Sequence, residues 1–231
     1  IALELKNRGF KVSVVTGYPN YPEGKIPKEY KSHKITKETY EGIEITRLPI
    51  IERGKDNKFK LMLNYASFPV SGFFWNLFHD IDADAVFIYE ASPMFQALPG
   101  VWHAKKKNIP CYMYVMDLWP ENLEVVGNIS SPLILKPIEK MVDYIYAGCD
   151  RIFTPSQAFT ERITARGVPE EKIEYWPQYA ESCYYPVNKE NVTIDAIPQD
   201  GILNLTFAGN IGYAQGLELL PQLACKLKDK D

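Results

Sequence analysis

Short apolar runs alternate with longer amphipathic segments along most of this chain. Runs rich in β-branched and aromatic residues occur at residues 11–17, 85–89, 111–116, 151–154, 173–176 and 203–208. Most of them are followed by a segment with helical spacing, which is the repeat of β-α-β units. The pattern therefore predicts the α/β class, with a Rossmann-like parallel sheet and helices on both faces.

The chain opens within a β-α-β unit. Residues 1–8 have the spacing of the last turns of an amphipathic helix that ends at Gly9. A helix that leads into a parallel strand over a tight glycine turn normally follows another strand. We therefore expect a strand and a loop before residue 1. Two later helices are expected to begin near Pro132 and Ser156.

Two polar stretches interrupt the repeat. Residues 24–60 are Lys-rich and contain one alternating run at 43–48, which we interpret as an insertion with an edge strand. Residues 188–201 are aperiodic and rich in turn residues, which is typical of an interdomain connection. The predicted organisation is a first domain at 1–187, a linker at 188–201, and the opening strand and helix (217–227) of a second domain at 202–231.

Composition narrows the class of protein. With 231 residues, 46% of them hydrophobic and 24% charged, the chain is typical of a folded globular protein. A net charge of −3 gives no global reason to bind nucleic acid. The four cysteines are far apart and form no zinc or thioredoxin pattern. Cys111 and Cys225 lie in apolar runs, where a thiol behaves as a small core residue.

No apolar run is long enough to span a membrane and no secretory leader opens the chain, so a cytoplasmic location is expected.

Asp117 is the leading candidate for chemistry. It directly follows the run at 111–116, and Pro120 suits the first position of a helix. Trp119 and Glu121 would then lie near the mouth of the crevice where parallel strands end. A carboxylate there can orient a sugar hydroxyl or act as a base. The alternative is that Asp117 caps a turn and Trp119 covers the core.

Other strand ends carry polar side chains of the same kind. Glu90 and Ser92 end the run at 85–89, where they are either ligand contacts or helix caps. The loop after the run at 11–17 holds Tyr18 and Asn20 between prolines and glycines. That mixture suits stacking on and hydrogen bonding to a sugar, and it equally suits a rigid turn without a ligand.

A glycine-rich segment, residues 209–216, joins the run at 203–208 to the last predicted helix. Glycines between a strand and a helix let the backbone approach an anion, and the helix N-terminus attracts phosphate. The segment is neither a dinucleotide fingerprint nor a P-loop. A plain strand-to-helix turn remains the alternative.

Residues 57–80 combine many aromatic and aliphatic side chains with lysines just upstream. Arg53, Lys55, Lys58 and Lys60 give this part of the chain a local basic bias. Such a segment either rests at a membrane interface or is a buried helix that covers the sheet.

Several short motifs in order resemble glycosyltransferase family 4, and most closely its bacterial branch that builds O-antigen, capsule and colanic acid. The motifs are Tyr18-Pro-Asn-Tyr-Pro22, Asp117-Leu-Trp-Pro-Glu121, Thr154-Pro-Ser156 with Gly167-Val168, Trp176-Pro177, and Phe207-Ala-Gly-Asn-Ile-Gly-x-Ala-Gln-Gly216. The resemblance implies a GT-B fold, with the acceptor on the first domain and a nucleoside-diphosphate sugar on the second. It also implies retention at the anomeric carbon and no required metal or other cofactor.

The resemblance also implies roles for particular residues. Asp117 would be catalytic, with an acceptor site around it. The acceptor-binding residues would be Tyr18, Asn20, Glu90, Ser92, Trp119 and Glu121. The donor-binding residues would be Gly209, Asn210, Gly212 and Gln215. Tyr213 and Gln215 stand where many members have Arg and Lys, so phosphate binding would depend on backbone N–H groups and on residues elsewhere.

The implied partners are a nucleoside-diphosphate sugar and a polyprenyl-linked or other saccharide acceptor, at the inner face of the cell membrane through residues 53–80. The family's first glycine-rich loop would precede residue 1, and its two glutamates eight positions apart would follow residue 231. The chain by itself is therefore expected to be an inactive N-terminal fragment.

Two other functions stay open. A nucleotide-sugar isomerase or epimerase of GT-B shape would need acid and base groups between the domains, and His33, His79 and His103 do not lie at strand ends. A non-catalytic nucleotide-sugar-binding module is the other. A nicotinamide dehydrogenase is disfavoured, because the chain lacks Gly-x-Gly-x-x-Gly.

Overall fold

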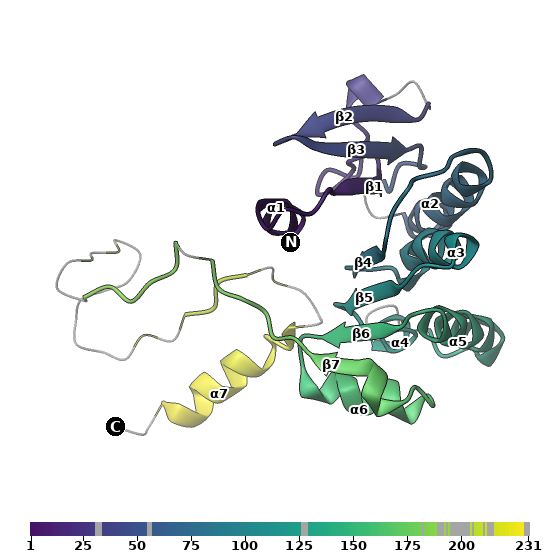
Figure 1. Cartoon of the computed structure of the whole chain (residues 1–231). Coiled ribbons are helices and arrows are strands. Elements are labelled where there is room, and N and C mark those ends of the chain that lie inside the picture. Colours follow the sequence, from purple (N-terminus) through teal and green to yellow (C-terminus); the bar gives the residue numbers. More distant parts are fainter. Residues whose placement is uncertain are drawn as a thin grey trace.

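The computed structural model gives the elements of one α/β domain followed by a C-terminal segment (Figure 1). The residues that the structure describes are 1–30, 34–54, 57–125, 129–181, 183–188, 192, 194, 204, 206–209, 211 and 215–228. The strands are β1 (Ser13–Gly17), β2 (Thr36–Tyr40), β3 (Ile43–Leu48), β4 (Val86–Glu90), β5 (Cys111–Val115), β6 (Arg151–Thr154) and β7 (Ile173–Tyr175). The α-helices are α1 (Ala2–Asn7), α2 (Lys58–Phe78), α3 (Leu98–Lys107), α4 (Glu121–Val125), α5 (Pro132–Ala147), α6 (Gln157–Ala165) and α7 (Leu219–Leu227).

Four strands form a parallel sheet in the order β4-β5-β6-β7. Its register pairs Glu90 at the end of β4 with Val115 at the end of β5, so these two strands finish together. The strands follow the apolar runs read from the sequence, and helices connect them as expected. The predicted α/β class with a Rossmann-like parallel sheet is confirmed.

A second sheet has the order β1-β3-β2. The central strand is β3, which runs parallel to β1 and antiparallel to β2. The prediction of an edge strand at residues 43–48 is therefore wrong, because β2 takes the edge. Burial explains the position of β3, since Ile43 and Leu48 at its two ends are both inaccessible to solvent.

The edge strands β1 and β4 lie where the two sheets approach each other. Among the described residues, β1 pairs only with β3 and β4 pairs only with β5. The expectation of a strand before residue 1 stays a prediction.

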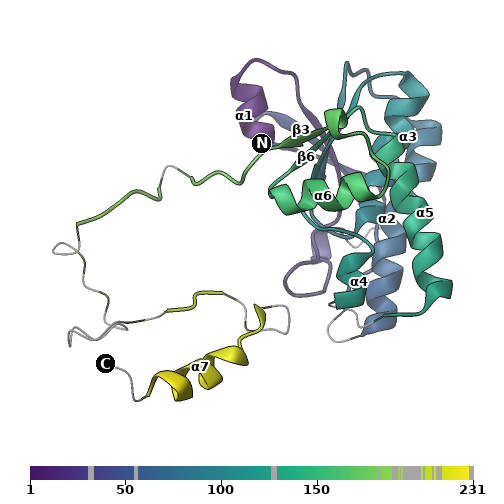
Figure 2. The ribbon, with the colours of Figure 1, turned by 90° about the horizontal axis from the view of Figure 1, so that it is seen from below.

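Helices lie on both sides of the strands. In Figures 1 and 2, α2, α3 and α5 lie together on one side and α1 lies on the other. Helices α2 and α3 cross closely at Gly72, where a Cβ atom would be 2.3 Å from Cγ of Pro99. Beside this crossing, Asn76 Nδ2 donates to the carbonyl of Pro99 at 2.8 Å.

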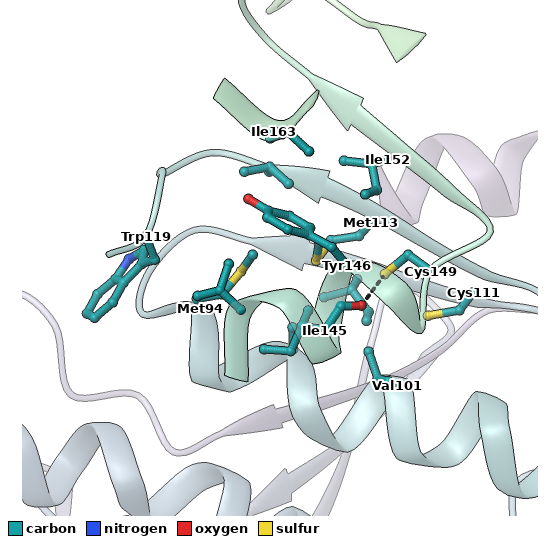
Figure 3. Close-up of a cluster of buried hydrophobic side chains, with 14 of the residues drawn as sticks. Met94, Val101, Cys111, Met113, Trp119, Ile145, Tyr146, Cys149, Ile152 and Ile163 are labelled. Atoms are coloured by element: carbon teal, nitrogen blue, oxygen red, sulfur yellow. Dashed lines mark hydrogen bonds between the residues drawn. The ribbon is translucent and has the colours of Figure 1, made fainter. Parts of the chain in front are cut away.

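The main core lies between the β4–β7 sheet and the helices α3, α5 and α6. Figure 3 shows Tyr146 of α5 among Met113, Ile152 and Ile163. Cys111 and Cys149 are buried free thiols in the same core, as expected for Cys111, and Cys149 Sγ donates to the carbonyl of Ile145. Cys225 is exposed, so its predicted core position is not found.

Two predicted helix starts are confirmed. Ser131 is the N-cap of α5 with Pro132 at its first position, and Ser156 is the N-cap of α6. Neither serine side chain makes a capping hydrogen bond. Each helix begins where the backbone changes from extended at the serine to helical at the next residue.

The C-terminal segment differs from its prediction. Residues 204 and 206–208 form no strand, and the remainder of the run at 203–208 lies outside the described residues, as does most of the linker at 188–201. Helix α7 begins at Leu219 rather than at 217 and has no buried residue. A single helix without a sheet has no core to cover.

Candidate functional site

The polar residues after β4 and β5 meet at the carboxyl ends of these strands. The backbone N–H of Asp117 donates to Oε2 of Glu90 at 3.4 Å, across the loops that leave the two strands. Asp117 is half-buried and keeps contact with solvent, whereas Glu90 is fully buried. The carboxylate that can reach a ligand is therefore that of Asp117, and the expectation that Glu90 lines the acceptor side is not supported by its burial.

Ser92 connects Asp117 to Trp119. Its side chain is hydrogen-bonded to the Asp117 carboxylate, and its Oγ accepts from Nε1 of Trp119 at 3.3 Å. The backbone of Ser92 has a φ of 130°, a conformation that L residues rarely adopt. With its amide oxygen turned toward the loop, Gln96 accepts from the N–H groups of Ala91 and Ser92 at 2.8 and 3.0 Å. These bonds hold the serine in its unusual conformation.

Trp119 is part of the core and does not line the crevice. Its side chain is 3% exposed. The indole packs edge-on against Phe95 and Tyr65, with ring centroids 5.3 and 6.3 Å apart. The alternative left open by the sequence, a tryptophan that covers the core, is the arrangement observed. Pro120 immediately precedes α4 and lies outside the helix.

Glu121 begins α4 and turns one oxygen inward. Its Oε2, Oε1 of Glu90 and the hydroxyl of Tyr146 are buried atoms that make no hydrogen bond within the described part of the chain. Burial raises the pKa of Tyr146, and the Glu90 and Glu121 carboxylates add to the shift, so the three groups are neighbours in one polar region. A buried polar atom without a partner costs about 1–3 kcal/mol, which makes this region unusual for an apolar core.

Burial changes the acidity of the carboxyl groups. Desolvation raises the pKa of Glu90 to about 8, with the neighbouring Asp117 carboxylate adding to the effect. Desolvation also raises the pKa of Asp117, opposed by its hydrogen bond to Ser92. Burial thus favours the neutral form of the Glu90 carboxyl group, although the N–H groups of Asp117 and Met116 oppose the shift. Two nearby carboxyl groups with different environments are a common arrangement where acids and bases have separate roles.

The ends of β6 and β7 reach the same region. The N–H of Trp176 donates to the carbonyl of Thr154 at 2.8 Å, and Nε2 of Gln178 lies 3.3 Å from Sδ of Met116. Gln178 thus lies beside the residue that precedes Asp117. Gln178 is not among the site residues predicted from the sequence, although it is a polar residue that follows a strand end closely.

Tyr18 and Asn20 occupy a separate cluster at the end of β1. Tyr18 is buried with Ile26 and Ile50, and its hydroxyl donates to the carbonyl of Lys34. Asn20 Nδ2 donates to the carbonyl of Tyr18 at 3.2 Å. No contact joins either residue to Asp117 in the part of the chain that the structure describes. The rigid-turn alternative accounts for both side chains.

The expected donor-binding turn is only partly described. Gly209 and Gln215 are exposed, whereas Asn210 and Gly212 lie outside the described residues. Within those described residues, no group of three His, Cys, Asp or Glu side chains could hold a metal ion.

Helix α2 has two apolar faces. One face is buried through Trp75 and Gly72 against α3. The other face forms an exposed stripe, here called the α2 stripe, at spacings of three and four residues. It consists of Phe59, Met62, Leu63, Val70, Phe73, Phe74, Leu77 and Phe78. The helix covers the domain with one face, as the second interpretation of residues 57–80 has it, and presents apolar side chains to solvent with the other. The membrane interpretation stays a prediction.

An apolar hollow of about 410 Å³ adjoins the α2 stripe. Ile50 and Ile51 form one wall, and Leu63 and Val70 of α2 form the other. Near the start of α2, the guanidinium of Arg53 lies over the ring of Tyr21 at 5.7 Å. Within the described segments, no helix combines the length and hydropathy needed to cross a membrane.

The fold and the site together define an α/β domain with a carboxylate-centred site at the carboxyl edge of a parallel sheet. The chain belongs to Glycosyltransferase Family 4, whose sequence profile matches residues 1–178. The predicted family membership is thereby confirmed, and the motif at 207–216 lies beyond the matched residues.

Two known proteins add detail. The chain is 23% identical, over 98% of its length, to a protein of Escherichia coli (strain K12) provisionally assigned as the colanic acid biosynthesis glycosyl transferase WcaI. It spans 57% of that relative's length. It also matches the structure of a UDP-N-acetylglucosamine 2-epimerase from Rickettsia bellii at 15% identity and a TM-score of 0.35, covering 72% of this chain and 44% of that one. A TM-score this low does not establish a common fold.

Proposed function

We propose that the protein transfers a sugar from a nucleoside-diphosphate sugar to a polyprenyl-linked saccharide during synthesis of a cell-surface polysaccharide. The observation that carries the proposal is Asp117, a partly exposed carboxylate fixed at the carboxyl ends of β4 and β5 in a chain of this family. Similarity to a protein assigned to colanic acid synthesis supports the choice of a surface polysaccharide.

The reaction we propose retains the configuration at the anomeric carbon. The bond from that carbon to the donor diphosphate breaks, and a bond to the acceptor hydroxyl oxygen forms on the same face of the sugar. Asp117 holds the acceptor hydroxyl by accepting its hydrogen bond, and the hydroxyl proton leaves to the departing diphosphate. Positioning and stabilisation of the diphosphate charge would supply most of the rate enhancement.

The donor would bind through Gly209, Asn210, Gly212 and Gln215 together with residues outside this chain. No metal is required in this scheme, because backbone N–H groups at a helix N-terminus can bind phosphate oxygens. On the acceptor side, Ser92 and Glu121 flank Asp117.

The α2 stripe would rest on the inner face of the cell membrane. An apolar helix face about 30 Å long, next to Arg53 and Lys60, fits an anionic bilayer surface better than it fits water. The opposite side of the same helix contacts the Asp117 region through Tyr65. A lipid-linked acceptor held at the membrane could therefore present its saccharide to the strand ends.

Product analysis with the whole protein tests this function. Incubation with labelled nucleoside-diphosphate sugar and an extracted polyprenyl-linked saccharide should release nucleoside diphosphate and label the lipid, with the α or β configuration of the donor kept. Conversion of the donor to another sugar without acceptor would favour the isomerase instead. Donor binding without turnover in either case would favour the non-catalytic module.

A further inference from the structure

The buried polar region beneath the Asp117 loop is centred on Glu90. Glu90 ends β4 two positions after Ile88, so its side chain points to the same face of the sheet, into the core. That face is packed against α5. Oε1 of Glu90 makes no hydrogen bond in the described structure, while Oε2 accepts from the N–H of Asp117.

Two titratable groups lie near Glu90, and a third acts on one of them. Asp117 lies above it after β5, Tyr146 reaches it from α5, and Glu121 of α4 is coupled to the same tyrosine. In Figure 3 the hydroxyl of Tyr146 points away from Cys149, toward the side of the core on which Trp119 lies. No cation is paired with Glu90 among the described residues, so the backbone N–H groups of Asp117 and Met116 oppose the cost of burying its charge, and Arg166 acts on the neighbouring Tyr146.

An apolar residue would suit the packing at position 90 better than a carboxyl group does. A buried ionisable group without a counter-charge is costly, and its retention calls for a role that Leu or Ile could not fill. The role that the geometry offers is its bond to the backbone of Asp117. Met116, the residue before it, also donates its N–H to the carbonyl of Glu90 at 2.8 Å.

We propose that Glu90 is a positioning residue, a buried carboxyl group that fixes the backbone of Asp117 from beneath while the Asp117 carboxylate meets the acceptor. This deepens the proposed glycosyl transfer and rests on it for the role of the acceptor. The two carboxyl groups then differ in charge. A neutral Glu90 lets Asp117 stay charged, whereas two ionised carboxylates at this separation would repel each other.

The structural part of the proposal can be tested on this chain without any substrate. The backbone ¹⁵N–¹H signal of Asp117 should shift with pH, with a midpoint near 8, as the group that accepts its N–H ionises. Glu90→Gln keeps an acceptor oxygen but cannot ionise, so the shift should disappear in that variant. Glu124→Gln, an exposed change on α4, should leave it in place. Ionisation of the Asp117 carboxyl group itself should shift the signal in both proteins. A signal without a further shift near pH 8, or one whose shift near pH 8 persists in Glu90→Gln, would overturn the proposal.

The functional part needs the whole protein. In the unaltered enzyme kcat should fall at alkaline pH as Glu90 ionises, and this fall should be absent in Glu90→Gln. Glu90→Leu fills the same space without an acceptor atom and should lose about 10- to 100-fold in kcat, since small misplacements cost this much, with donor KM unchanged and thermal stability kept. Normal kcat in Glu90→Leu would refute the positioning role even if sugar transfer is established. Absence of any transfer would refute the proposed function, with the Asp117 signal still deciding the structural part.

Discussion

The ring of Tyr65 on α2 meets the indole of Trp119 edge-on, with centroids 6.3 Å apart and planes at 77°. This pair joins the helix that carries the α2 stripe to the loop that carries Asp117. Trp119 continues the connection, because its Nε1 donates to Ser92, which is in turn bonded to Asp117. The α2 stripe and Asp117 are thus the two ends of one continuous chain of contacts.

Trp119→Ala should lower the free energy of unfolding by about 3–5 kcal/mol, the range for removal of a buried aromatic side chain. Trp119→Phe should cost less, because it keeps an aromatic ring in the core and loses the bond to Ser92. Urea denaturation measures both. Trp176→Ala removes a tryptophan that is 41% exposed and serves as the control. An equal loss in Trp176→Ala and Trp119→Ala would contradict the assignment of Trp119 to the core.

Asp117→Asn in the whole protein should reduce kcat by roughly 10²- to 10⁴-fold. A neutral amide accepts a hydrogen bond from the hydroxyl of the sugar acceptor far more weakly than a carboxylate does. Binding of the donor should hardly change, since Asp117 lies on the acceptor side. Steady-state kinetics and calorimetric donor titration separate the two effects. Unchanged turnover would remove Asp117 from the mechanism.

Glu90 should make folding stability fall as pH rises. Its pKa is raised from 4.5 to about 8 in the folded protein, so the folded state holds a proton that the unfolded state has lost between these values. The stabilisation is complete below pH 4.5 and is lost progressively up to pH 8, by an amount on the order of 4 kcal/mol. Urea denaturation at pH 5, 6.5 and 8 should show this slope in the unaltered protein and a flatter one in Glu90→Gln. Parallel slopes in the two proteins would contradict the prediction.

The α2 stripe should bind anionic vesicles. Replacing Phe59 and Phe78, which are 69% and 79% exposed, by Ser should weaken co-sedimentation with vesicles at least roughly tenfold, since each buried Phe is worth about 1.5–3 kcal/mol. Leu133→Ser is the matched control, because Leu133 is 88% exposed on α5.

Charge should contribute as well. Replacing Arg53 and Lys60 by Glu should weaken binding to anionic vesicles more than to neutral ones. If the stripe instead joins two copies of the chain, analytical ultracentrifugation would show dimers that the Phe59 and Phe78 changes dissociate, and vesicles would not be bound.

Gly72→Ala should destabilise the protein, although Ala is favoured over Gly in a helix by about 1 kcal/mol. The new Cβ would be 2.3 Å from the rigid ring of Pro99, and overpacking of this kind costs roughly 1–3 kcal/mol. Ala66→Gly, on the exposed side of the same helix, should cost about 1 kcal/mol from propensity alone. A gain in stability for Gly72→Ala would show that α2 and α3 do not approach closely at this point.

Local patterns were sufficient for most of the strands and several helix starts. The runs that become β1, β4, β5, β6 and β7 are short, apolar and β-branched or aromatic, and Asp117 follows one of them directly. Such features depend on neighbouring residues in the chain, so the sequence alone placed Asp117 at a strand end. The same local information gave the α/β class.

Contacts between distant segments decided the rest. Whether residues 43–48 form an edge or a central strand depends on which strands lie on either side, and the alternation of side chains does not record this. Glu90 and Trp119 carry polar groups that suit a crevice, yet the packing of α5, η2 (Met94–Ala97) and Tyr65 around them makes both buried. The sequence by itself determined which residues end the strands. Only the tertiary structure decided which of those side chains reach solvent, because burial is set by the helices that pack over the sheet.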